Sequence, residues 1–212
     1  MSKSKTAVLK SVVLALIVGT GLAFVLYKGS EVFFSAKRKQ TLVKNIELGQ
    51  EGSGELVFPV GSQMPNISFK ALSGTGGVYD LQKDKSALKI INFWASWCEP
   101  CVEEFSSFAR LLKKTKEPVA FVGVSEDKTL KDAKDFLKAF SGDFKDLENV
   151  HFGFDDNKKH SLKYGLLALP ESFIVDANNK LIRRVSGFER WDSKEAIDYF
   201  NHLIDEQKKK GH

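Results

Sequence analysis

The sequence predicts an α/β domain built on a mixed β-sheet with helices on both faces. Apolar runs typical of buried strands alternate with amphipathic segments of helical spacing. The alternation ends in two consecutive strands joined by a short turn, so the sheet is expected to be mixed and not wholly parallel. The 212 residues are 42% hydrophobic and 28% charged, which is ordinary for a globular chain with one sizeable core.

The expected elements begin near residue 57. Two short strands are expected at 66–72 and 78–81, on either side of a glycine-rich segment, SGTGG. The run ALKIINFWA, residues 87–95, is typical of a central parallel strand that is covered on both faces. Residues 101–116 carry apolar side chains at helical spacing, at 102, 105, 108, 109, 111 and 112, and predict a helix.

The second half of the chain continues this alternation. Strands are expected at 119–125, 171–177 and 180–187, and helices at 128–140, 158–165 and 192–207. Asp192 or Ser193 is expected to cap the last helix. The segment HFGFDD at 151–156 has no assigned element.

The N-terminal segment is expected to anchor the chain in a membrane. Residues 1–10 are basic, and residues 11–27 form an uncharged apolar run. As a helix this run spans roughly 25 Å, and flanking lysines can cover the shortfall against a ~30 Å hydrocarbon core. A cleaved signal peptide is the alternative, because Gly21-Leu22-Ala23 offers small residues at the required spacing. A spacer at 28–56 then leads to the domain at 57–212.

The charges give a weaker indication of topology and partners. Five basic residues follow the apolar run and outnumber the positive charges before it: Lys28, Lys37, Arg38, Lys39 and Lys44. Counting charges would therefore place the domain inside, although long translocated domains override this bias. Over the whole chain 32 basic and 27 acidic residues are interspersed, which argues against nucleic-acid binding.

Cys98 and Cys101 are the only cysteines, and they form a C-x-x-C motif directly after the buried run. A structural zinc ion needs about four ligands, and there is no second pair. The four histidines show no ligand spacing and are expected on the surface or in loops: His151, His160, His202 and His212. A structural disulfide this short closes almost no loop. Reversible dithiol chemistry is therefore favoured, while copper binding by the two thiols stays open.

The position of the pair at a strand-to-helix junction suits this chemistry. Free N–H groups and the helix dipole at the helix start favour a Cys98 thiolate, and Pro100 fits the first turn. Glu99 opposes that ionisation by charge repulsion, which favours a reductant over an oxidant. Cys101, one turn in, is expected to be less exposed and to resolve a mixed disulfide. Glu104 either handles a proton for the buried thiol or complements the helix dipole.

A second motif, LLALPESFIVD, places Pro170 directly before a strand, where proline is unusual. If the preceding peptide bond is cis, this loop can lie against the cysteines and present backbone groups to an extended substrate.

NFWASWCEPCVEEF together with LPESFIVDANNKLIRRVSG resembles the membrane-anchored thioredoxin-like proteins of the TlpA, ResA and CcmG type, over roughly residues 57–207. The resemblance implies a thioredoxin-like fold and thiol-disulfide exchange on the outer, periplasmic side of a bacterial cytoplasmic membrane, without a cofactor or a metal. It implies a redox-active disulfide with Cys98 as the attacking thiol and Cys101 as the resolving thiol, together with a cis-proline at Pro170 and an acidic Glu104. The expected substrate-binding residues surround these positions: Trp97, Glu99, Pro100 and Leu169.

The resemblance also implies partners. Electrons are expected from a DsbD- or CcdA-like membrane protein and are passed to a disulfide-bearing client, such as apocytochrome c before haem attachment. Two alternatives stay open: a reductant for other exported thiols or metal-site cysteines, and a module that delivers copper. A reductant is most useful where disulfides form, which favours a domain outside the cytoplasm.

Overall fold

The computed structural model describes residues 58–72 and 77–210. The predicted basic segment, membrane anchor and spacer, residues 1–56, lie outside the described residues. Within the described ranges, no helix is both long enough and apolar enough to cross a membrane.

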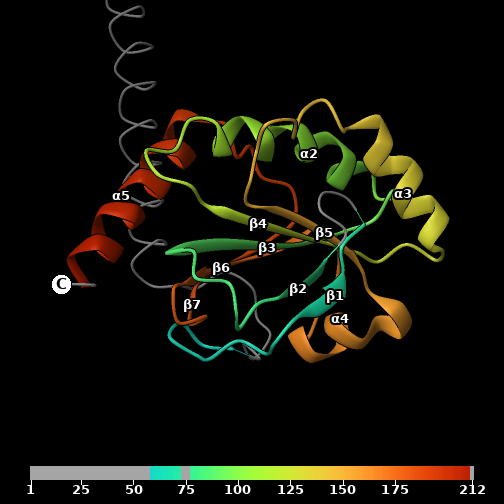
Figure 1. Ribbon diagram of the computed structural model, residues 1–212, viewed down its shortest axis with the longest axis horizontal. Helices are drawn as coiled ribbons and strands as arrows, with labels where there is room; N and C mark the ends of the chain where they lie inside the picture. Colours follow the sequence, from blue (N-terminus) through green and yellow to red (C-terminus); the bar gives the residue numbers. More distant parts are fainter. Residues whose placement is uncertain (1–57, 73–76, 211–212) are drawn as a thin grey trace, which may run out of the picture. The chain divides into compact units, whose positions relative to one another are not determined.

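A five-stranded mixed sheet forms the centre of the domain, in the order β5-β4-β3-β6-β7 (Figure 1). The central strand β3 pairs parallel with β4 and antiparallel with β6, which confirms the predicted mixed sheet. The strands are β3 (Leu88–Trp94), β4 (Ala120–Ser125), β5 (Val150–Phe154), β6 (Glu171–Asp176) and β7 (Leu181–Ser186). A separate antiparallel hairpin consists of β1 (Ser68–Lys70) and β2 (Val78–Asp80).

The helices follow the predicted order. They are α2 (Glu99–Leu112), α3 (Leu130–Ala139), the 3-10 turn η1 (Asp156–Lys158), α4 (Lys159–Tyr164) and α5 (Lys194–Lys210). The Thr129 side chain caps α3 by accepting the Asp132 N–H. Ser193 and not Asp192 caps α5, since its Oγ accepts the N–H of Ala196.

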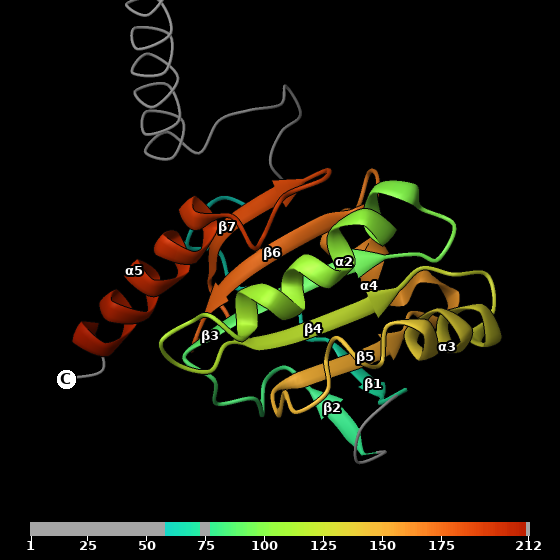
Figure 2. The ribbon, with the colours of Figure 1, turned by 90° about the horizontal axis from the view of Figure 1, so that it is seen from above.

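Alternating side chains of the strands build two hydrophobic cores, one on each face of the sheet. Leu88, Ile90 and Trp94 of β3 face a core shared with α2, α3 and α5. Ile91 and Phe93 face the opposite core. Figures 1 and 2 show α2, α3 and α5 together over the first face.

The second face also carries a helix, as predicted, but a hairpin covers the rest of it. The β1–β2 hairpin and the six-residue α4 cover it, with Phe69, Tyr79 and Tyr164 buried in its core. Strands β3 and β4 are fully buried, so their apolar pattern cannot distinguish a covering hairpin from a covering helix.

Strand β5 and His160 are two further differences from the prediction. Gly153 lies within β5 and weakens the sequence pattern of the strand. The packing requires a glycine there, because a Cβ on Gly153 would lie 2.3 Å from the Phe69 ring. His160, expected at the surface, is 5% exposed on α4, where its Nε2 bonds the carbonyl oxygen of Ser68.

The strand register brings three chain segments to one edge of the sheet. Trp94, the last residue of β3, lies opposite Ser125, the last residue of β4. Phe93 lies opposite Glu171, the first residue of the antiparallel β6. The residues that follow β3, follow β4 and precede β6 therefore meet at this edge.

Candidate active site

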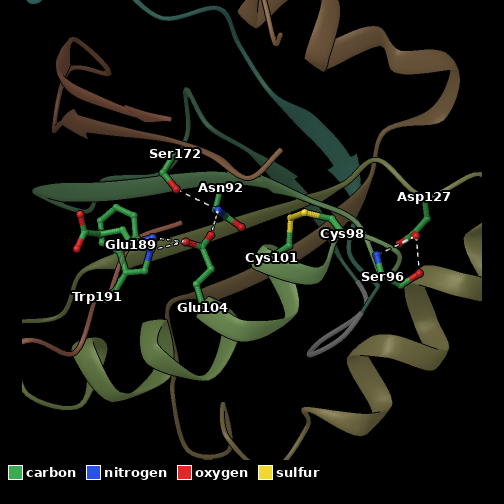
Figure 3. Close-up of a disulfide and its surroundings, with 9 residues drawn as sticks. All are labelled: Asn92, Ser96, Cys98, Cys101, Glu104, Asp127, Ser172, Glu189 and Trp191. Atoms are coloured by element: carbon green, nitrogen blue, oxygen red, sulfur yellow. Dashed lines mark hydrogen bonds between the residues drawn. A yellow bond between two sulfur atoms is a disulfide. The ribbon is translucent and has the colours of Figure 1, made fainter. Parts of the chain in front are cut away.

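The two cysteines lie where this edge meets the start of α2 (Figure 3). Cys98 is the N-cap residue with extended backbone angles, and Pro100 falls in the first turn, as expected. The Cys98 carbonyl oxygen accepts the Val102 N–H at 3.1 Å. A disulfide joins Cys98 and Cys101, whose Cα atoms are 5.2 Å apart.

The two sulfur-bearing residues differ in exposure. Cys98 is 6% exposed and Cys101 is completely buried. Trp97 beside Cys98 is 65% exposed, and Glu99 is also exposed. A partner therefore reaches the pair from the Cys98 side.

A buried carboxylate holds the loop that leads to Cys98. Asp127 Oδ1 accepts the Ser96 backbone N–H at 3.0 Å and the Ser96 hydroxyl at 2.7 Å. Its Oδ2 accepts the hydroxyl of Ser125 at 2.8 Å. Because Asp127 lies two residues beyond β4, this cluster ties the cysteine loop to the end of the neighbouring strand (Figure 3).

Glu104 is the buried carboxyl group of the site, 2% exposed and one turn beyond Cys101 on α2. Its Oε2 accepts the backbone N–H of Glu189 at 3.1 Å and the indole N–H of Trp191 at 3.2 Å. Both donors belong to the segment between β7 and α5. Desolvation by burial raises the pKa of Glu104 to about 7, against the opposing effect of these hydrogen bonds.

Asn92 of β3 connects Glu104 with β6. Its Nδ2 donates to Glu104 Oε1 at 3.2 Å and to the hydroxyl oxygen of Ser172 at 3.0 Å. Figure 3 shows the Asn92 side chain between Glu104 and the disulfide.

The peptide bond between Leu169 and Pro170 is cis, as the sequence motif suggested. The Pro170 carbonyl oxygen accepts the N–H of Gly187 at 2.9 Å, which fixes the loop against the end of β7. Within the described ranges, neither the N–H nor the carbonyl of Leu169 is used in a hydrogen bond. The Leu169 side chain is half-buried and packs against the core cluster that contains both cysteines.

The structure thus brings together the predicted cysteines, Glu104 and Pro170, with Trp97, Glu99, Pro100 and Leu169 around them. Other residues of the site were not predicted: Asn92, Ser96, Asp127, Ser172 and Trp191. Asn92 left a signal, because it and Lys89 are the two polar residues in the buried run at 87–95. Within the described residues, no group of three His, Cys, Asp or Glu side chains is placed to hold a metal ion.

Comparisons with known proteins agree with this geometry. The Redoxin family model matches residues 59–203. The thiol-disulfide oxidoreductase ResA of Bacillus cereus is 27% identical over 197 residues, which cover 92% of this chain and 95% of ResA. The thiol:disulfide interchange protein HelX of Rhodobacter capsulatus is 28% identical over 127 residues, 60% of this chain and 68% of HelX.

Solved structures show the same fold. The exposed lipoprotein thioredoxin of Streptococcus pneumoniae superposes with a TM-score of 0.52 at 22% identity, covering 66% of this chain and 99% of that protein. StoA of Bacillus subtilis gives a TM-score of 0.51 at 19% identity, with 66% and 96% covered. The chain belongs to the Redoxin family, as a thiol-disulfide oxidoreductase of the TlpA, ResA and CcmG type with a thioredoxin-like fold.

Proposed function

We propose that this oxidoreductase is tethered to the bacterial cytoplasmic membrane by residues 11–27 and reduces client disulfides outside the cytoplasm. The observation that carries the proposed reduction is the difference in exposure between the two cysteines. Cys98 is slightly exposed at the start of α2, and Cys101 is fully buried one turn further on. The helix N-terminus stabilises a thiolate at Cys98, and burial protects Cys101 from outside partners.

The reaction follows from this arrangement. The Cys98 thiolate attacks one sulfur of the client disulfide, which forms a mixed disulfide and releases the other client sulfur as a thiolate. Cys101 loses its proton and attacks Cys98, which forms the enzyme disulfide and releases the second client thiolate. The client gains two electrons and the enzyme loses two. A membrane donor of the DsbD or CcdA kind then returns two electrons to the enzyme disulfide.

Client binding is assigned to the residues around Cys98. The N–H and carbonyl of Leu169, which bond to no other described residue, can pair with an extended client backbone, and Trp97 offers an exposed apolar surface next to Cys98. The cis-proline loop at Pro170 and the first turn with Glu99 and Pro100 complete this surface.

Glu99 supports the direction of the reaction. It is an exposed carboxylate next to Cys98, so it disfavours the thiolate and with it the reduced form. Glu99→Gln should therefore make the pair more oxidising, by roughly 10 mV for a screened surface charge. Equilibration with glutathione measures this potential. A wild-type potential in the strongly oxidising range would contradict a reductase.

The client we propose is apocytochrome c, on the basis of the resemblance to the CcmG type. Cys101→Ser should trap the client on Cys98, because no resolving thiol remains. The trapped complexes are isolated from cells and identified by mass spectrometry, with Cys98→Ser/Cys101→Ser as the matched control. Recovery of other exported thiol proteins, and not of apocytochrome c, would replace the client and leave the reductase in place.

Two further measurements test the location and the chemistry. Protease added to intact spheroplasts should digest the domain, and protection from the protease would contradict the outer location. Insulin reduction by the reduced protein should proceed without added metal. Tight copper binding without any disulfide reduction would favour copper delivery instead.

A further inference from the structure

The two polar atoms of the Asn92 side chain differ in their hydrogen bonding. Its Nδ2 donates to Glu104 and to Ser172, whereas Oδ1 is buried and has no hydrogen-bond partner within the described residues. Figure 3 shows this oxygen on the side of the amide that points toward the disulfide. A buried carbonyl oxygen without a hydrogen-bond partner is unfavourable. We therefore expect another state of the protein in which a donor reaches Asn92 Oδ1.

Reduction supplies such a donor. Disulfide sulfurs carry no hydrogen, but a Cys101 thiol has one S–H, which the Asn92 oxygen can accept. In the reduced protein, Asn92 Nδ2 then donates to the Glu104 carboxylate, and Asn92 Oδ1 accepts the S–H of the Cys101 thiol.

If the Asn92 amide is turned over, it stabilises protonated Glu104 and a Cys101 thiolate instead. The Asn92 oxygen then accepts a proton held on Glu104 Oε1, and Nδ2 points toward a Cys101 thiolate. Glu104 Oε2 is already used by the N–H groups of Glu189 and Trp191, so Oε1 is the atom left for the proton. The Ser172 hydroxyl is compatible with both orientations, because it can accept from Nδ2 or donate to Oδ1.

We propose that Asn92 is a positioning residue whose amide reverses with the proton on Glu104, so that it stabilises either a Glu104 carboxylate beside a Cys101 thiol or a Cys101 thiolate beside protonated Glu104. The role in turnover rests on the proposed function of Cys101 as the resolving thiol. The proton leaves Cys101 Sγ and binds Glu104 Oε1. The thiolate then attacks Cys98, the new S–S bond forms, and the bond to the client sulfur breaks with its electron pair on the client.

The charges that face Glu104 are few. Cys101 lies on the same helix, and the Glu189 carboxylate, from the segment after β7, raises the pKa of Glu104 by charge repulsion. Asn92 from β3, Ser172 from β6 and Trp191 do not titrate in this range. The proton on Glu104 is therefore expected to be the main determinant of the amide orientation in the oxidised protein.

The first test uses the oxidised full chain in lipid nanodiscs, labelled with ¹⁵N-asparagine. Nuclear Overhauser contacts from the Asn92 NH₂ hydrogens should go to Glu104 above the Glu104 transition and to the Cys101 β-hydrogens below it. Glu104→Gln should remove the pH dependence. An NH₂ group that keeps one set of contacts through the transition overturns the proposal.

The second test measures resolution of a preformed mixed disulfide on Cys98 by rapid quench. Asn92→Leu should slow it about tenfold near neutral pH, because the Cys101 thiolate loses a charge-assisted hydrogen bond. Trp191→Phe is the matched control, since it removes a donor to Glu104 and leaves Asn92 in place, and it should shift the pH profile without that loss. Wild-type resolution by the Asn92 variant overturns the proposal.

The two failures are distinguishable. The spectroscopic test needs no client and no turnover, so it stays decisive if the reductase function fails or if Asn92→Leu does not fold.

Discussion

Arg184 and Glu171 form a buried ion pair directly behind the cis-proline loop, with 2.5 Å between Nε and Oε1. Their side chains are 13% and 3% exposed. Glu171 Oε1 also accepts the Ser186 hydroxyl at 2.8 Å, and Arg184 Nη2 donates to the Gly165 carbonyl at 3.3 Å. The pair therefore joins β6, β7 and the segment that leads from α4 to Leu169.

Removing one partner of this pair should be strongly destabilising. Arg184→Met leaves the Glu171 carboxylate buried without its cation, at an expected cost of about 3 kcal/mol in the free energy of unfolding. Adding Glu171→Leu should recover most of that loss. Urea denaturation measures both. Arg183→Met is the control, since Arg183 interacts with Tyr199, lying over its ring at 5.4 Å, and its loss should cost about 1 kcal/mol or less. Equal losses at Arg183 and Arg184 would contradict the assignment.

Glu104 should make the oxidised protein less stable as pH rises. The folded state keeps this proton up to a pKa of about 7, against 4.5 for an ordinary glutamate, so the folded state binds more protons across this window. Stability therefore falls through the window and stays low above it. The shift corresponds to about 3 kcal/mol.

Glu104→Gln isolates this contribution. Burial and the neighbouring Asp155 also raise the pKa of Glu126 to about 7, so the wild-type slope contains both groups. The unfolding free energy of the variant minus that of the wild type should increase by about 3 kcal/mol between about pH 4 and pH 8. The variant is therefore relatively more stable at high pH. Parallel pH profiles of the two unfolding free energies would show that Glu104 does not titrate in this window.

Asp127→Ala should loosen the loop before Cys98. It leaves the Ser96 N–H and two hydroxyl groups without their acceptor, so we expect a loss of about 2 kcal/mol in stability and slower client reduction. Chemical denaturation and insulin reduction measure the two effects. The control is Asp135→Ala, whose fully exposed ion pair with Lys131 should leave stability and turnover unchanged. Unchanged turnover in the Asp127 variant would contradict a positioning role.

Trp97→Ala should weaken client binding without affecting the fold. The side chain is 65% exposed, so its removal should change stability by about 0.5 kcal/mol or less. The KM for a client peptide should rise several-fold, because the apolar contact beside Cys98 is lost. Val78→Ala, at a side chain that is 74% exposed on β2, should leave KM unchanged. A fall in kcat at constant KM would place Trp97 outside client binding.

The sequence by itself determined the elements whose signal is local. The apolar run of β3, the helical spacing of α2 and the C-x-x-C motif between them place Cys98 at a helix start, because backbone geometry and periodicity act over a few residues. The cis bond at Pro170 is instead implied by the family resemblance, since a proline before a strand does not specify it alone. The local pattern does not predict β5, because Gly153 in this strand is required by its packing against Phe69, which is distant in sequence.

Only the tertiary structure decided the environment of the pair. Asn92 and Glu104 are 12 residues apart and Asn92 and Ser172 are 80 apart, and Trp191 reaches Glu104 across 87 residues. Burial and hydrogen bonding depend on which surfaces meet after the chain has folded. The proton affinity of Glu104 and the partners of Asn92 therefore cannot be read from the C-x-x-C motif.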